Sequence, residues 1–145
     1  MHAHAARTRR GFTLIELIIV VVVLGILAAV ATPKFTNTSD SARENAAKQT
    51  LSVLRNAIEV YKTEEGSYPA AGTIETDLAD YIRGDFPSPG VGSRASAAGV
   101  GATTANPPSA VGGATDDGWL YNASVGEIWI NDVGTDSESN TFMSW

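Results

Sequence analysis

The sequence contains no cysteine, and its two histidines, His2 and His4, both lie before Gly11. Without cysteine the chain has neither a disulfide framework nor a thiolate metal site. A chain that loses residues 1–11 also lacks histidine, which is the commonest general base and metal ligand. These absences argue against an enzyme.

Basic residues are scarce after Gly11. All sixteen acidic residues follow it, together with seven of the ten basic ones, so the chain from residue 12 onward has a net charge of 7 − 16 = −9. An acidic surface of this kind repels nucleic acid phosphates. We therefore expect no direct nucleic acid binding.

Charge is also absent from Phe12 to Ala31, except at Glu16. A helix of this length measures about 30 Å at ~1.5 Å per residue, which matches the hydrocarbon core of a bilayer. The arginines before Gly11 favour a cytoplasmic N-terminus and an external C-terminal part. A secretory signal peptide cut at Ala29-Val30-Ala31 is the alternative. The apolar run exceeds the usual ~7–15 residues of such peptides, and Glu16 interrupts it.

The run begins with Arg10-Gly11-Phe12-Thr13-Leu14-Ile15-Glu16-Leu17. This motif resembles the cleavage and methylation signature of type IV prepilins and type II secretion pseudopilins, and the resemblance covers the leader and the apolar helix. It implies that a membrane-embedded prepilin peptidase cuts between Gly11 and Phe12 and methylates the new amino group of Phe12. It also implies that Glu16 pairs with the Phe12 ammonium of a neighbouring subunit during assembly.

The chemistry of Glu16 agrees with that role. A carboxylate inside an apolar span costs about 2–4 kcal/mol on insertion scales, so its presence predicts a partner. Cleavage after Gly11 would create a positive amine, and two opposite charges attract strongly once both are desolvated. Thr13 is assigned a local role, with its hydroxyl bonded to a carbonyl one turn back.

Gly25 and Pro33 are weak points of the predicted helix, because glycine costs ~1 kcal/mol and an interior proline ~3 kcal/mol or more. One interpretation is a continuous helix that is kinked here, as in similar pilins. In the other, Pro33 marks a boundary and Ser41-x-x-Glu44 caps a new helix. The sequence leaves both open.

Residues 33–66 are predicted to form the amphipathic half of the long helix. Apolar residues recur at spacings of four and three, which places them on one face; they are Ala47, Leu51, Leu54, Ile58 and Tyr61. Gly66 is expected to end the helix as a C-cap. The apolar face should pack on a sheet.

Residues 67–145 are predicted to form a small globular head. A short second helix is expected at Thr73–Arg83, and a long exposed loop, mobile or laid over the head, at 88–117, where apolar area is small. Two runs rich in β-formers flank a four-residue turn within 118–132, which predicts a hairpin. The segment 117–131 also resembles a hairpin of G-like pseudopilins. One assignment turns Leu120, Ile128 and Ile130 toward the helix and Trp119, Tyr121 and Trp129 away, and the reverse fits the same period of two.

The oxygen-rich segment 131–138 is a candidate calcium loop, because Ca²⁺ accepts carboxylates and carbonyls in loose geometry. G-like pseudopilins hold calcium in a C-terminal loop of this general kind, but their longer aspartate-rich ending is not found here. Asp132 and Asp136 are the candidate ligands, and no cofactor is otherwise required. The alternative is a solvated acidic loop.

Together these features predict an α+β protein with a pilin-like fold, in which a long N-terminal helix, transmembrane over residues 12–32, packs on a small antiparallel sheet. The predicted function is that of a structural subunit in the homopolymeric filament of a type II secretion pseudopilus. The resemblance implies prepilin peptidase, an inner-membrane assembly platform and minor pilins or pseudopilins as partners, with the head outside the cytoplasm. A type IV pilin for adhesion, motility or DNA uptake is the alternative, and a membrane-tethered binding module that never polymerises is a third.

Overall fold

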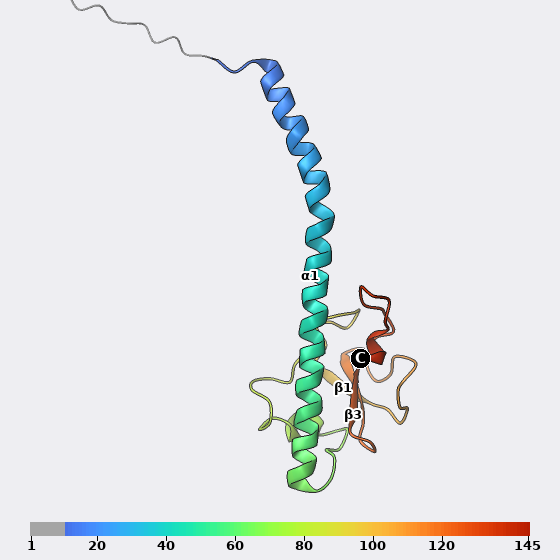
Figure 1. The fold of residues 1–145 in the computed structure, drawn as a ribbon. Coiled ribbons are helices and arrows are strands. Elements are labelled where there is room, and N and C mark those ends of the chain that lie inside the picture. Colours follow the sequence, from blue (N-terminus) through green and yellow to red (C-terminus); the bar gives the residue numbers. More distant parts are fainter. Residues whose placement is uncertain (1–10) are drawn as a thin grey trace, which may run out of the picture. The chain divides into compact units, whose positions relative to one another are not determined.

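The computed structural model describes the backbone of residues 11–145 and the side chains of residues 11–29 and 39–145. Its elements are three helical segments and three strands, in the order α1, α2, β1, β2, β3, η1 (Figure 1). The chain divides into two compact units, residues 1–38 and 39–145. The second unit contains the whole sheet and, with it, the globular head.

Helix α1 extends from Leu14 to Glu65. It ends where expected, because Gly66 adopts a left-handed conformation with φ of 77° and its amide donates to the Lys62 carbonyl oxygen at 2.9 Å. The interpretation that starts a new helix at Ser41 is wrong, since α1 continues without interruption through this region. Glu44, the residue expected to complete that cap, instead accepts hydrogen bonds from the Ser137 amide and hydroxyl at 2.8 and 2.7 Å.

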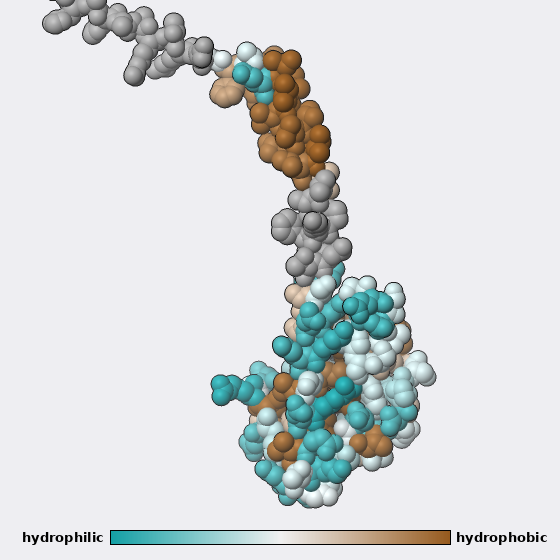
Figure 2. Space-filling view, viewed as in Figure 1, coloured by the Kyte–Doolittle hydropathy of each residue, from teal (hydrophilic) through white to brown (hydrophobic). Residues whose placement is uncertain are grey.

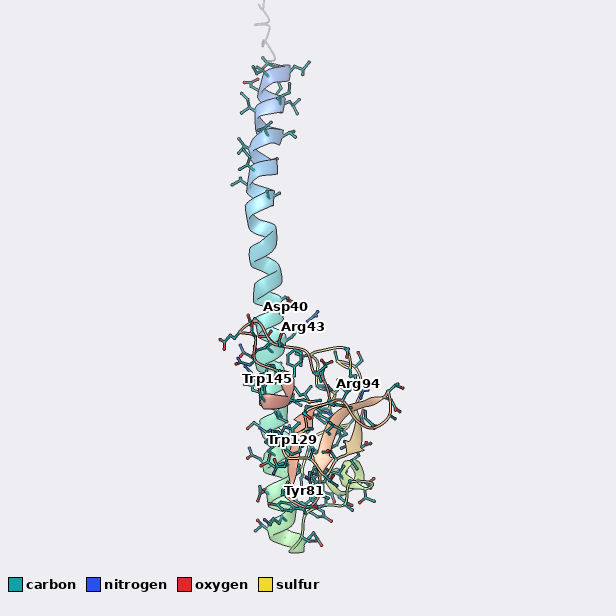
Figure 3. All side chains as sticks on the ribbon, turned by 90° about the vertical axis from the view of Figure 1, so that its right-hand side faces the viewer. Asp40, Arg43, Tyr81, Arg94, Trp129 and Trp145 are labelled. Carbon is teal, nitrogen blue, oxygen red and sulfur yellow. The ribbon has the colours of Figure 1, made fainter. Side chains whose placement is uncertain are left out.

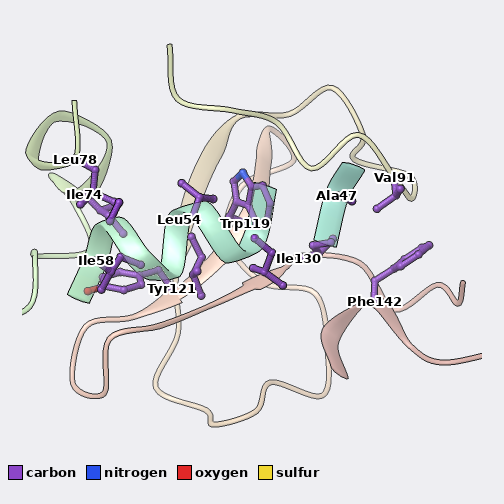
Figure 4. Packing of buried hydrophobic residues seen from close by; sticks show 13 residues of the cluster. Ala47, Leu54, Ile58, Ile74, Leu78, Val91, Trp119, Tyr121, Ile130 and Phe142 are labelled. Carbon is purple, nitrogen blue, oxygen red and sulfur yellow. The ribbon is translucent and has the colours of Figure 1, made fainter. Parts of the chain in front are cut away.

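The apolar face predicted for the second half of α1 is confirmed. Four of its five members are at most 2% exposed, and Tyr61 is partly buried against them; the four are Ala47, Leu51, Leu54 and Ile58. They pack on side chains from β2 and β3 to form the main core (Figure 4). Helical periodicity was sufficient to find this face because one side of α1 covers the sheet.

The sheet consists of β1 (Gly99–Ala102), β2 (Asp117–Asn122) and β3 (Glu127–Ile130), in that spatial order. The two strands of the expected hairpin pair antiparallel, with Trp119 opposite Ile130 and Tyr121 opposite Ile128. The first strand pairs parallel to β2. The sheet is therefore mixed, and the prediction of a wholly antiparallel sheet is wrong.

The strand β1 lies within 88–117, where the sequence predicts a loop without regular structure. Its residues, Gly99-Val100-Gly101-Ala102, have weak β-propensity, so their pairing with β2 depends on tertiary context. Two glycines are required here because a methyl group on Gly99 or Gly101 would crowd the Asp117 side chain at 2.8 Å. The Val100 amide on the open edge donates to Oε1 of Glu75 at 3.2 Å.

The faces of the hairpin also differ from the assignments made from sequence. The helix-facing set is mixed, with Trp119 and Tyr121 beside Ile128 and Ile130, all fully buried in the main core. The register explains this result, because directly opposed residues point to the same face. Leu120 and Trp129 form an opposed pair on the other face.

The second helix is shorter than predicted. Helix α2 covers Ile74–Asp77, and residues 78–83 continue as turns and bends, held by bonds such as Tyr81 N–H to the Leu78 carbonyl oxygen at 3.0 Å. Leu78 is fully buried, and the Tyr81 hydroxyl donates to Oε2 of Glu64 at 2.6 Å. The turns are thus fixed to the end of α1 by side chains. A 3₁₀ turn, η1 (Phe142–Ser144), lies near the C-terminus.

Candidate functional site

Helix α1 starts with reciprocal hydrogen bonds between Thr13 and Glu16. The Thr13 amide and hydroxyl both donate to Oε2 of Glu16 at 2.8 Å, and the Glu16 amide donates to the Thr13 hydroxyl oxygen at 3.3 Å. This is a capping box, in which the N-cap residue and the third helical residue satisfy each other's amides. Glu16 is therefore held at the helix start by its own chain.

The role of Thr13 differs from the one predicted. Thr13 immediately precedes the first helical residue, Leu14, and its hydroxyl donates forward to Glu16 rather than back to a carbonyl. The sequence did contain the signal, because Thr-x-x-Glu at 13–16 is a capping-box pattern of the same type as Ser41-x-x-Glu44. Thr13 thus belongs to the same site as Glu16.

Gly11 and Phe12 lie in non-helical chain just before the cap. The Phe12 side chain is 85% exposed, and a methyl group added to Gly11 would meet no atom within 4 Å. Exposed, irregular chain is where proteolytic cleavage is favoured. Cleavage between these residues, methylation of Phe12 and its pairing with Glu16 of another subunit stay predictions.

The helix beyond Glu16 presents apolar side chains on all sides. Every large apolar residue from Leu14 to Leu27 is between 48% and 78% exposed, and this part of α1 forms a continuous brown surface in Figure 2. A helix that is apolar all round is normally buried, and soluble monomers rarely expose contiguous apolar patches of more than a few hundred Å². This surface is expected to be covered in the working protein.

Among the described residues, no helix combines the length and the apolar character that crossing a membrane requires. The span predicted for residues 12–32 continues past Ala29 into a stretch whose side chains lie outside the described part of the chain.

The predicted kink site is described in part. Gly25 lies within α1, and a methyl group there would meet nothing within 4 Å. Pro33 falls in the stretch 30–38, outside the described side chains. The kink at these residues stays a prediction.

Asp132, the first candidate calcium ligand, is 5% exposed and already bonded within the head. Its Oδ2 accepts from the amide and hydroxyl of Ser93, and its Oδ1 from the Gly134 amide, all at 2.6 Å. Burial disfavours the charged carboxylate, but the bonds from Ser93 and Gly134 and the nearby positive charge of Arg94 outweigh it and lower the pKa of Asp132. The carboxylate links 88–117 to the chain that follows β3.

Asp136, the second candidate, has separate partners. Its Oδ1 accepts from the amides of Glu138 and Asn140 at 2.9 and 2.8 Å, and its Oδ2 accepts from Nε1 of Trp145 at 3.2 Å. Nζ of Lys48 on α1 lies 3.5 Å from Oδ2. Burial opposes ionisation of Asp136, but the surrounding donors, led by Asn140, prevail and lower its pKa.

The two aspartates share no bonding partner, so the structure does not bring them together as one ligand set. Within residues 11–29 and 39–145, no group of three or more histidine, cysteine or acidic side chains is arranged to hold a metal ion. Carboxylates that accept several protein hydrogen bonds have little capacity left for a cation. Calcium binding stays a prediction.

Comparison with known proteins points to the same N-terminal site. The family described as "Prokaryotic N-terminal methylation motif" matches residues 6–32. Several relatives bear the name type II secretion system core protein G. That of Pseudomonas aeruginosa is 41% identical over 64 residues, which cover 44% of this chain and 45% of the relative.

The same protein of Aeromonas hydrophila is 36% identical over 63 residues, or 43% of this chain and 44% of the relative. That of Escherichia coli is 34% identical over 65 residues, or 45% of each. The chain thus spans less than half the length of the curated relatives it matches, and no solved structure matches it significantly. These matches confirm the resemblance: residues 6–32 match the prokaryotic N-terminal methylation motif, and less than half of the chain is similar to core protein G of type II secretion systems.

Proposed function

We propose that this chain is a structural subunit of a type II secretion pseudopilus with a pilin-like fold. Prepilin peptidase cuts it between Gly11 and Phe12 and methylates Phe12, and the mature chain polymerises through the first part of α1. The family match at residues 6–32 and the core protein G relatives support this proposal. No catalytic role is assigned to any residue.

One observation carries the proposal, namely a single carboxylate fixed at the start of a helix whose first part, from Leu14 to Leu27, presents apolar side chains on every side. Oε2 of Glu16 accepts both bonds from Thr13, and no described donor contacts Oε1. Oε1 therefore remains available to a second cation. The ammonium of Phe12 on a neighbouring copy has the charge that this oxygen needs, and charge-assisted hydrogen bonds are the stronger ones.

The exposed apolar surface of α1 suggests two successive environments. Before assembly, residues 12–32 are proposed to span the inner membrane, with the N-terminus in the cytoplasm and the head outside it. In the filament, the same surfaces pack against α1 helices of other copies. When a subunit moves from the lipid into the helix bundle of the filament, its apolar surface stays out of water. The lone charge of Glu16 therefore decides the position of the subunit along the filament axis.

The proposal is tested by mass spectrometry of the membrane-extracted protein, together with a Glu16→Ala variant. We expect a mature chain that begins at methylated Phe12, and loss of filaments with cleavage intact in the variant. A mature start at Thr32 would instead mean a secreted protein. If the Glu16→Ala variant still forms filaments, the assembly role of Glu16 is contradicted. Retained activity without filaments would favour a tethered binding module.

Deleting the gene for this chain from its host tests whether the filament is a pseudopilus or a type IV pilus. We expect substrates of the type II system to accumulate inside the cell, while twitching and DNA uptake continue. The opposite pattern would identify a type IV pilin.

A further inference from the structure

The sheet has a second buried face, which lies outside the main core. Leu120 and Trp129 are opposed on this face and are 1% and 5% exposed, but neither belongs to the cluster that α1 covers. The chain over Leu120 comes from residues 103–116, which we call the strap. A methyl group on Gly112 would lie 3.2 Å from Cδ2 of Leu120, so the backbone of the strap passes close to this leucine.

The strap adds little apolar contact of its own. Within residues 103–116, Pro108 is buried and Thr103 and Gly112 are partly buried, while every other residue is exposed. Its valine, Val111, is 45% exposed. Because apolar burial is the main favourable term in folding, the strap is held more weakly than the face of the sheet that α1 covers.

Polar bonds hold the strap instead, and they converge on Gly112. Oδ1 of Asn131 accepts from the Gly112 amide at 3.0 Å, and Nδ2 of Asn131 donates to the Gly112 carbonyl oxygen at 2.7 Å. Nη1 of Arg94, on the side of the head away from α1 (Figure 3), donates to the same oxygen at 3.1 Å. Asn131 is fully buried directly after β3. We call these three bonds the latch.

The ends of the strap are fixed separately. At one end the Thr103 amide donates to the Tyr121 carbonyl oxygen at 2.9 Å, and at the other the Ala114 amide donates to Oδ2 of Asp117 at 2.6 Å. Residues 106–111 make no hydrogen bond with the described part of the chain. Release of the latch therefore frees the middle of the strap while both ends stay attached.

We propose that the strap opens as a unit while the main core stays folded, and that Asn131 is the residue that controls this opening. Segments with few buried apolar contacts are the ones that open locally in folded proteins. The open head exposes Leu120 on the face of the sheet away from α1 and keeps the contacts of the α1 face. The strap is thus the part of the head that changes shape without global unfolding, whether or not the chain forms filaments.

Thiol labelling of the folded protein tests the opening, because the chain has no cysteine of its own. Leu120→Cys places a thiol under the strap, and Ile128→Cys places one in the main core at a similarly buried position. In the full-length protein in detergent, the first thiol should react with a maleimide at least about tenfold faster than the second, and its rate should depend little on urea. The same steep dependence on urea at both positions would overturn the inference.

The role of Asn131 is tested in the same two backgrounds. Asn131→Ala should speed the labelling of Leu120→Cys several-fold more than that of Ile128→Cys. Asn140→Ala is the matched control, because it removes an amide that donates to Asp136 in the C-terminal segment, and it should leave the labelling of Leu120→Cys unchanged. Equal acceleration at both positions by Asn131→Ala would overturn the latch.

Hydrogen exchange gives a second measurement, which needs no substitution. The Gly112 amide of the parent protein should exchange with little dependence on urea, because only the latch has to break. Exchange of this amide at the rate of global unfolding would overturn the inference even if Leu120→Cys failed to fold.

Discussion

Gly126 leaves open the space that the ring of Tyr68 occupies. A methyl group at position 126 would overlap the ring, and Gly126 also has a φ of +74° at the end of the turn between β2 and β3. The Tyr68 hydroxyl accepts from Nζ of Lys62 at 2.8 Å and donates to Oε1 of Glu59 at 3.0 Å. This pair therefore fastens the hairpin to the last turns of α1.

Gly126→Ala should destabilise the head by more than about 1 kcal/mol, because alanine disfavours the left-handed conformation and its methyl group displaces Tyr68. Gly72→Ala is the matched control, since Gly72 has no positive φ and a methyl group there meets nothing within 4 Å. Urea unfolding of the full-length protein in detergent, followed by tryptophan fluorescence, measures both. Equal urea midpoints for the two variants would contradict the role of Gly126 in holding the hairpin against Tyr68.

Leu54→Ala should lower the free energy of unfolding by about 2–5 kcal/mol, because Leu54 is fully buried between α1 and the sheet and its truncation leaves a cavity. Its neighbour Val53 is 49% exposed, so Val53→Ala should change the free energy by no more than about 0.5 kcal/mol. The same unfolding assay compares them. A similar loss of unfolding free energy in the two variants would mean that the apolar face of α1 had been assigned wrongly.

The sequence is most informative where a local pattern decides the structure. The spacing from Ala47 to Tyr61 locates the buried face of α1, because helical geometry relates those positions directly. The hairpin follows from β-forming residues on both sides of a short turn. Gly66 ends the helix because it adopts a positive φ without steric cost.

The sequence is less informative where distant segments decide the structure. The weak strand Gly99–Ala102 exists because β2 pairs with it, and its own residues do not favour a strand. The faces of Trp119 and Leu120 depend on cross-strand register as well as on the period of two. The ion pair of Lys48 with Asp136 joins residues that no local spacing connects.

Thr13→Val should weaken assembly several-fold while leaving cleavage after Gly11 complete. Valine has nearly the shape of threonine but lacks the hydroxyl that donates to Oε2 of Glu16, so the capping box loses two of its three bonds. Thr13→Ser keeps the hydroxyl and should assemble normally. Filament yield by electron microscopy and processing by mass spectrometry distinguish the two variants. If Thr13→Ser assembles as poorly as Thr13→Val, the loss of the hydroxyl does not explain the assembly defect.

Acidification should destabilise the head in part through Asp132. The folded-state pKa of Asp132 is lowered, so its stabilising contribution is complete above the unfolded value of about 3.9 and is lost as pH falls below it toward the folded value. Asp132→Asn should lower the free energy of unfolding by about 1–3 kcal/mol at neutral pH. The amide nitrogen of asparagine is itself a donor, so it cannot accept the hydrogen bonds that Ser93 and Gly134 donate to the carboxylate.

The variant should also lose less stability than the parent protein on acidification. Asp85→Asn is the control, because this carboxylate is exposed and makes no hydrogen bond or ion pair with the described residues, and it should follow the parent curve. Unfolding free energies measured from pH 7 to pH 3 decide the matter. If stability falls with pH in the same way in Asp132→Asn and in the parent, the stabilising role of the Asp132 carboxylate is contradicted.

Removal of calcium should leave the melting temperature unchanged. Asp132 and Asp136 bond to separate internal donors, and Lys48 supplies a positive charge at Asp136, so protein contacts of their own fasten the C-terminal segment to α1. Thermal melting of the full-length protein with added EGTA, and again with excess calcium, tests this expectation. Lys48→Met should lower the melting temperature in both conditions, because it leaves the Asp136 charge without its cation. A fall with EGTA that calcium reverses would instead establish the calcium loop inferred from the oxygen-rich sequence at 131–138.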